Sequence, residues 1–362
     1  MSISLQQYVP CLRWKQGEYQ ALLRLTPDIK NVLVPLVEVS EIGFDFETQT
    51  ENKTIDQHLS AFAKRVKDKW GARPCFIDMH LIKASKRMAN GEHPFTFVFN
   101  DLRLKGVPAI PIIRLEQDSE CQNAIESIIA QDQRGLCLRI NIADTLNPDL
   151  TRTVEHLLRR YHQEVENCDF ILDLGAPNFD PIDDFGRLLN TIIANLPHRE
   201  KWRSFIILGT AFPSSMAEVS QGISIKPRSE WRLYRFLVNN LQSSGLRIPT
   251  FGDYGINHPD VLVVDMRIVR PSATVRYTIN NGWLIVKGTN VRDNGLSQYR
   301  QLCQRVISSK HYYGPSYSMG DKYIYDCAQG TVSTGSLTTW RYVGTNHHLT
   351  KVVRDVANLF GS

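Results

Sequence analysis

The sequence predicts an α/β protein, a (β/α)8 TIM-like barrel with a C-terminal α+β extension. Three observations support this prediction. Short apolar runs that end in a polar or charged residue recur over residues 8–254, most of them are separated by a stretch long enough for a helix, and the pattern changes after residue 258. Parallel strands that are covered by helices consist of such apolar runs, and eight of them close a barrel.

The strands are expected where the apolar runs lie, in the order 8–14, 31–39, 74–79, 108–115, 136–140, 170–174, 205–208 and 249–253. Helices are expected between them, at 17–25, 54–70, 95–104, 120–131, 147–166, 184–196 and 229–241. Within 54–70, Leu59, Phe62, Ala63 and Val66 recur at helical spacing. Crossovers between parallel strands are expected to be right-handed.

The barrel is expected to end near His258, which divides the chain into a barrel at 1–258 and an extension at 259–362. In the extension, VRYTI and WLIVKG flank Asn281-Gly282, a pair that suits the tight turn of a β-hairpin. Helices are expected at 296–309 and 348–360. Asn346 is expected to cap the terminal helix.

Charge and aromatic residues are unevenly distributed along the chain. The extension has twelve Lys or Arg, six Asp and no Glu, which gives it a net charge of +6. The overall net charge of the chain is +5, so the barrel has a net charge near −1. Eight of the thirteen tyrosines also lie there. A basic, aromatic-rich segment suggests a surface for nucleic acid or an acidic protein, whereas the alternative is a small domain whose aromatic residues form its core.

Cysteine usage and hydropathy bear on the compartment. The seven cysteines are scattered without a CxxC pair or a zinc-ligand spacing with histidine, which indicates reduced thiols. No apolar run approaches the roughly 18 residues of a membrane helix, and the N-terminus lacks the features of a secretion signal. We expect a cytoplasmic protein without a membrane segment.

The ends of the predicted strands collect polar and charged residues. Side chains two apart on a strand share a face, which pairs Asp78 with His80, Arg114 with Glu116 and Arg139 with Asn141. The other strands end at Lys15, Glu38, Asp173, Thr210 and Asp253. Such groups cannot be buried unpaired, so they are expected to pair, bind a ligand or bind a metal at the barrel mouth.

Three interpretations of this mouth remain open. Carboxylates could hold Mg²⁺ or Mn²⁺, with Asp78 and Glu116 as ligands, while arginines bind a phosphate. Glu38, Asp78 or Glu116 could instead be the general acid and base for a sugar. Otherwise the charges form an internal salt-bridge network. No HExxH, P-loop or dinucleotide motif decides between them.

A second polar cluster, WRYVGTNHH, spans residues 340–348. Adjacent histidines on a helix face different directions, so His347 and His348 are not expected to bind one metal together. Either histidine could still reach the barrel mouth as part of a lid.

Four segments together resemble the phage-associated Beta family: YVPCLRWKQGEYQAL, FGDYGI, SMGDKYIYDCA and TTWRYVGTNHHLTKVV. They occur in this order from one end of the chain to the other. The resemblance implies a gene neighbouring that of the Gop protein and a role in anti-phage defence or phage exclusion with partner proteins from the same operon. It supplies no catalytic residues, but it favours the residues within these segments, among them Lys15, Asp253, Arg341, Asn346, His347 and His348.

The resulting hypothesis is a cytoplasmic component of a multi-gene defence system whose barrel mouth recognises a phosphate-bearing ligand, a nucleotide or a nucleic-acid end. In an enzymatic version with metal-dependent phosphoryl or phosphodiester chemistry, Glu38, Asp78, Glu116 and Asp253 are expected to hold the divalent ion, and His80 is expected to be the acid or base. Ligand contacts are expected from Lys15, Arg114, Arg139, Asn141, Asp173, Arg341, Asn346, His347 and His348. The alternative is a non-enzymatic scaffold or regulatory subunit whose mouth charges are structural.

Overall fold

Eight parallel strands close into a barrel in the computed structural model, which describes residues 2–260 and 268–361. The strands are β1 (Val9–Arg13), β2 (Leu36–Glu38), β5 (Cys75–Asp78), β6 (Ala109–Ile113), β7 (Cys137–Asn141), β8 (Asp169–Asp173), β9 (Ser204–Gly209) and β11 (Thr250–Asp253). Each follows its neighbour in the chain around the ring, and β11 closes onto β1. The predicted barrel and all eight of its strand positions are therefore confirmed.

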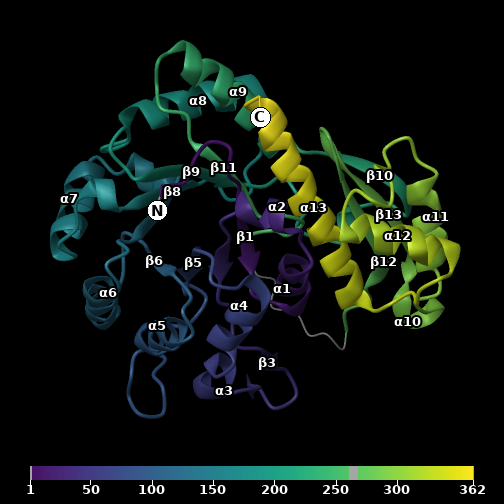
Figure 1. Cartoon of the computed structure of the whole chain (residues 1–362), viewed down its shortest axis with the longest axis horizontal. Helices are drawn as coiled ribbons and strands as arrows, with labels where there is room; N and C mark the ends of the chain where they lie inside the picture. Colours follow the sequence, from purple (N-terminus) through teal and green to yellow (C-terminus); the bar gives the residue numbers. More distant parts are fainter. Residues whose placement is uncertain (1, 261–267, 362) are drawn as a thin grey trace.

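Helices cover the outside of the barrel (Figure 1). They are α1 (Gln16–Leu23), α2 (Pro27–Asn31), α3 (Ile55–Leu59), α4 (Phe62–Trp70), α5 (Pro94–Leu104), α6 (Ser119–Asp132), α7 (Leu150–Arg160), α8 (Ile182–Asn195) and α9 (Ser229–Ser243). Single 3-10 turns lie at η1 (Ala143–Leu146), η2 (Val165–Asn167) and η3 (Met216–Glu218), and β3 (Phe44–Asp45) pairs with β4 (Thr50–Glu51).

Two expected helices are shorter or divided. Thr54 caps α3 through a reciprocal pair of hydrogen bonds with Gln57, but the expected helix 54–70 breaks between α3 and α4. The helix expected at 147–166 ends at Arg160, and His162 follows with a φ of 50°. A non-glycine residue in the left-handed region does not continue an α-helix, so the chain turns there.

The barrel interior has an apolar floor and a charged top. An inner cluster of apolar side chains, including Val9, Leu36 and Phe76, fills the lower barrel. At the carboxyl ends of the strands the register aligns Arg13 with Glu38 and Glu38 with Asp78. Neighbouring positions of parallel strands point to the same face, so these charges lie side by side above the apolar layers.

The C-terminal part forms a three-stranded antiparallel sheet and four helices. The sheet has the order β10-β13-β12, from β10 (Gly222–Pro227), β12 (Ser272–Ile279) and β13 (Gly282–Asn290). The expected hairpin is present, but its tight turn lies at Asn280-Asn281, because Gly282 already pairs with Ile279. The helices are α10 (Val291–Asn294), α11 (Tyr299–Ile307), α12 (Met319–Gln329) and α13 (Leu337–Leu359). Because β10 lies in the loop between two barrel strands, this sheet draws on sequence from both sides of residue 258.

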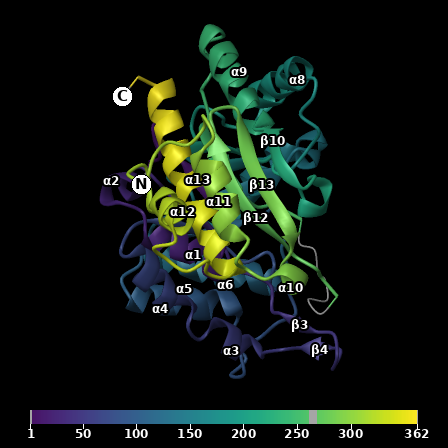
Figure 2. The ribbon, with the colours of Figure 1, turned by 90° about the vertical axis from the view of Figure 1, so that its right-hand side faces the viewer.

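The terminal helix α13 joins the barrel to this sheet. It runs between them and packs on α1 and β12, while Figure 2 shows it beside α11 and α12. It begins at Leu337, capped by Ser336, so the expected start at residue 348 and the expected N-cap Asn346 are wrong. Close packing requires Gly17, because a Cβ there would lie 2.3 Å from Cγ of Arg341.

Candidate ligand site at the barrel mouth

A buried arginine is the centre of the mouth. Arg139 on β7 donates to Glu38 at 3.0 Å and to Asp78 at 2.7 Å through Nη1. Its Nη2 and Nε donate to Asp173 at 2.7 and 3.0 Å, and Nη2 also reaches the Tyr254 hydroxyl at 2.8 Å. Charge-assisted hydrogen bonds of this kind compensate the desolvation of a buried guanidinium. The sequence-predicted residues Glu38, Asp78, Arg139 and Asp173 are thus brought together.

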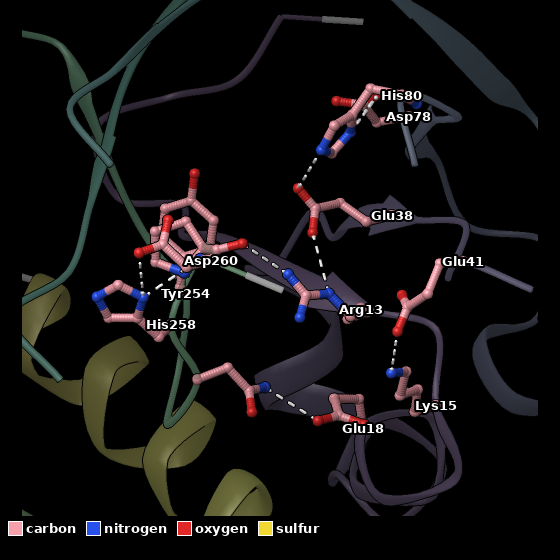
Figure 3. A network of polar contacts seen from close by, with 12 residues as sticks. Arg13, Lys15, Glu18, Glu38, Glu41, Asp78, His80, Tyr254, His258 and Asp260 are labelled. Atoms are coloured by element: carbon pink, nitrogen blue, oxygen red, sulfur yellow. Dashed lines mark hydrogen bonds and ion pairs between the residues drawn. The ribbon is translucent and has the colours of Figure 1, made fainter. Parts of the chain in front are cut away.

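A histidine continues this network toward solvent (Figure 3). Nδ1 of His80 lies 3.0 Å from Oδ1 of Asp78, and Nε2 lies 3.9 Å from Oε1 of Glu38. Burial opposes ionisation of Asp78, but His80, Arg114 and Arg139 together hold the pKa of Asp78 well below its usual range. The His80 side chain is 29% exposed, so it is an accessible imidazole backed by an ionised carboxylate. Such a pair can transfer a proton to or from a bound ligand.

A pocket of about 540 Å³ opens beside this histidine, at the carboxyl ends of β5 and β6. Polar groups from Asp78, His80, Arg114 and Glu116 line it, together with Lys83 and Lys86. Its apolar wall comes from Met79, Ile82, Pro94, Phe95 and Ile112. An apolar wall with a few polar groups is typical of a small-molecule site, and its position at the C-terminal face of the barrel is where such sites occur.

The residues fit a divalent cation poorly. In the described part of the chain, one group of side chains has metal-ligand proximity, namely Glu38, Asp78 and His80, and Glu116 is not part of it. Glu116 is exposed on the rim of the same pocket, so of the two expected metal ligands, Asp78 and Glu116, only Asp78 belongs to this group. Nη1 of Arg139 already lies between the oxygens of Glu38 and Asp78, where it repels a second cation.

Asp253 does not lie in the mouth, which corrects the expectation from the sequence. Its side chain faces outward, accepts a hydrogen bond from the Tyr8 hydroxyl, and lies 3.0 Å from Nε2 of His348 on α13. The other ring nitrogen of His348 lies 2.9 Å from the Thr278 hydroxyl. Burial lowers the pKa of His348, which favours a neutral ring that donates to Asp253. This cluster is buried and connects the barrel to the C-terminal sheet.

The remaining tail residues also lie away from the mouth. His347 is buried, with Nδ1 2.8 Å from Asp321 and Nε2 2.8 Å from the Thr278 carbonyl. Asn346 accepts from the amide of Gly320 and donates to the carbonyl of Ala21. These contacts hold α13 against α12 and α1, so neither histidine is a lid over the mouth.

Three expected ligand residues lie near the barrel rim. Lys15 is 51% exposed and pairs with Glu41 at 2.7 Å. Asn141 is exposed and accepts from the amide of Asp144 in the following turn. Arg341 binds the carbonyl of Ile256 and the side chain of Asn257, both in the loop after β11.

Two mouth residues were not predicted. Tyr254 follows β11 directly and donates from its hydroxyl to Asp173 at 2.7 Å. Arg13 ends β1, with Nε 3.9 Å from Glu38 and Nη2 donating to the carbonyl of Pro259. Both residues could have been found from the two-residue alternation of strand side chains, since Tyr254 shares the inner face with Gly252, and Arg13 shares it with Cys11.

The fold and this site define a (β/α)8-barrel protein with a charged mouth and a pocket at its C-terminal face. The chain belongs to the Beta protein family, whose sequence model matches residues 8–354. A comparison with curated protein sequences found no match.

Solved structures with a similar fold include triosephosphate isomerase from Bartonella henselae. The identity is 9%, the TM-score 0.33, and the match covers 68% of this chain and 91% of that one. A glycoside hydrolase family 5 enzyme from Prevotella bryantii, in complex with a xyloglucan tetradecasaccharide, matches with 9% identity and a TM-score of 0.35, over 72% of this chain and 94% of that one. These likenesses concern the barrel fold alone. Among the described residues, none of the helices has the length and apolar character that crossing a membrane demands.

Proposed function

We propose that this Beta-family protein recognises a phosphate-bearing ligand of nucleotide size in the pocket beside β5 and β6. The observation that carries the proposal is one cavity in which three cations, Lys83, Lys86 and Arg114, lie beside an apolar wall, with Asp78, Glu116 and Asp118 as the acids of the same lining. A nucleotide is complementary to both parts, because its phosphate is anionic and its base has an apolar face.

The phosphate half of the pocket is centred on Arg114. Its Nη2 donates to Asp78 at 3.0 Å, whereas its buried Nε has no hydrogen-bond partner. The side chain is 31% exposed and lines the pocket, so the guanidinium has donors to spare for a phosphate. Lys83 and Lys86 lie on the same rim, both near Glu51, and add positive charge that a phosphate would share.

The base half of the pocket lies at the start of α5. Pro94 and Phe95 open this helix, and the rings of His93 and Phe95 stack with centroids 5.9 Å apart. Flat rings and aliphatic side chains accept a nucleobase with little dependence on its identity.

The catalytic form of this proposal assigns proton transfer to His80. Asp78 orients its imidazole, and Glu38 lies near the second nitrogen. Glu116 and Asp118 are the other acids that line the pocket, while Asp253 is too remote to take part. Because Arg114, Lys83 and Lys86 already supply positive charge at the pocket, this form requires no divalent ion.

The test is ligand binding by calorimetry and thermal shift with nucleoside mono- and triphosphates, with and without Mg²⁺. Arg114→Ala is expected to weaken binding at least tenfold, as the loss of a charge-assisted contact implies. Arg160→Ala is the matched control, since Arg160 is also 31% exposed and ion-paired, to Glu126, but does not line the pocket. Equal binding by the two variants, or binding that appears only with Mg²⁺, would contradict the proposal.

In the cell, we propose that the protein acts in the cytoplasm as one component of a multi-gene anti-phage defence or phage-exclusion system, with protein partners from its operon. Its membership of the Beta family supports this role. Phage plating with the whole operon is the test: Arg114→Ala should abolish protection at unchanged melting temperature, whereas Arg160→Ala should retain it. Full protection by Arg114→Ala would show that the defence function does not depend on the pocket.

A second candidate function, a non-enzymatic scaffold or regulatory subunit, is favoured by the Arg139 network. Its hydrogen bonds satisfy three carboxylates internally, as a purely structural salt-bridge network would. Absence of nucleotide binding together with full protection by Arg114→Ala would select this alternative.

A further inference from the structure

A second cavity system lies between the barrel and the C-terminal sheet, away from the mouth pocket. It consists of two adjoining cavities of about 740 and 510 Å³. The two share the lining residues Arg13, Asn257, Pro271, Ser272, Arg276 and Arg341. We call this region the arginine cleft, because three of the six shared residues are arginines.

Positive charge in the arginine cleft exceeds negative charge among the described residues. Lys15, Arg270 and Lys287 also line one or the other cavity, against the carboxylates of Glu18 and Asp260. The nearest carboxylate to Arg13 is Glu38, at 3.9 Å, and Glu38 already accepts from Arg139.

Arg276 on β12 is the least compensated of these cations. Its side chain makes no hydrogen bond or ion pair with any described residue, and its Nε is buried without a partner. Burial and the neighbouring charge of Arg341 lower the pKa of Arg276 to about 9. An arginine kept in such surroundings destabilises the protein unless an anion occupies the cavity.

The surrounding structure holds the arginines in place. Arg341 is fixed by the loop after β11 and lies against Gly17, which leaves room for it. The cleft also includes the start of α1, where Lys15 provides no side-chain cap. The unpaired amide groups of a helix start add positive potential to that of the arginines.

We propose that the arginine cleft is an anion site for a phosphoryl group carrying two or more charges, such as a terminal phosphate or a pyrophosphate. Guanidinium groups match the geometry of phosphate oxygens and bind them through paired hydrogen bonds. By fold-level analogy, barrels often hold phosphate at the loops after the seventh and eighth strands, and Met216 and Asn257 of the cleft lie in these loops. The site is separate from the pocket beside β5 and β6 and does not depend on it.

The test uses Arg276→Gln with inorganic pyrophosphate as the probe, followed by thermal shift. Without ligand, the variant should melt about 2 °C or more above the wild type, because an uncompensated buried charge is removed. Pyrophosphate at about one hundred times its Kd should raise the wild-type melting temperature by about 5 °C and leave Arg276→Gln unchanged. Arg232→Gln, an exposed arginine of α9, is the control and should respond like the wild type.

Two further arms locate the source of the phosphate and separate the two sites. A 5′-phosphorylated oligonucleotide is compared with the same strand carrying a 5′-hydroxyl, and dependence on both the 5′-phosphate and Arg276 would identify a nucleic-acid end. Response to pyrophosphate alone would identify a small phosphate compound. Arg114→Ala should keep the pyrophosphate response. The proposal is overturned if pyrophosphate does not shift the wild type, or if Arg276→Gln still responds or melts below the wild type without ligand.

Discussion

The barrel mouth and the arginine cleft handle buried arginines in opposite ways. In the mouth, Arg139 donates to Glu38, Asp78 and Asp173, so its charge is compensated within the protein. In the cleft, Arg276 has no acidic partner among the described residues and faces Arg341. Both arginines come from strands, but Arg139 is buried, whereas Arg276 is half-buried and lines the two cavities.

The two regions differ in the source of the negative charge that balances their arginines: the protein itself in the mouth, and a bound ligand in the proposed cleft site. A compensated network stabilises the fold when intact and destabilises it when one member is lost. An uncompensated cluster has the reverse property, since it costs stability until a ligand supplies the missing charge. Opposite signs of the stability change on removing an arginine therefore distinguish a structural region from a binding region.

Arg139→Met should give the largest effect. It leaves three carboxylates buried without their cation, which is expected to cost about 3–5 kcal/mol of unfolding free energy. Urea denaturation measures this, with the exposed Arg152→Met as control. A loss below about 1 kcal/mol, the range of a surface ion pair, would mean that the Arg139 network contributes little to stability and that the mouth does not differ from the cleft in this way.

Glu230→Gln tests an intermediate case, a buried carboxyl with an imperfect partner. Burial raises the pKa of Glu230 to about 8, and Arg228 lies 3.5 Å away without a hydrogen bond. The folded protein therefore holds this proton more tightly than the unfolded chain does. The stability that Glu230 contributes is complete below its ordinary pKa of 4.5 and is lost as the pH rises through about 8.

The Gln variant keeps a neutral side chain at every pH. It should be more stable than the wild type by about 4 kcal/mol at pH 8.5 and nearly equal to it at pH 4.5. Denaturation at a series of pH values measures the difference, with the exposed Glu166→Gln as control. A pH-independent difference would mean that Glu230 stays ionised and that Arg228 compensates it fully.

Lys15→Ala should give the smallest effect. Its ion pair with Glu41 is exposed at the rim, so the stability change should stay within about 0.5 kcal/mol. The melting temperature and nucleotide binding of this variant should match the wild type. Loss of nucleotide binding without loss of stability would place Lys15 in the nucleotide site and not only in the lining of the arginine cleft.

The mouth could largely be predicted from the sequence. Apolar runs located the strands, and period-two alternation then placed Glu38, Asp78, Arg139 and Asp173 on the inner face at the carboxyl ends. The same rule applied to Asp253 was wrong, because the inner face of β11 is defined by Gly252 and Tyr254. A shift of one residue at a strand end exchanges inside and outside.

The arginine cleft could not be predicted, because its members come from distant segments. Arg13 ends β1, Arg276 lies in β12 and Arg341 lies in α13, and none stands in a local motif. The polar run at 345–348 in α13 likewise has the composition of a solvent-exposed face. In the structure it is buried between α1, α12 and the C-terminal sheet, where Asp253 and Asp321 pair with its histidines.

By itself, the sequence determined the barrel, the order of its strands and the end at which charged residues gather, because apolar runs and a two-residue period are local properties of a chain. Only the tertiary structure decided which charges are compensated. Arg139 meets Glu38 across the barrel, whereas Arg276 meets Arg341, since electrostatic compensation depends on distances between groups far apart in sequence.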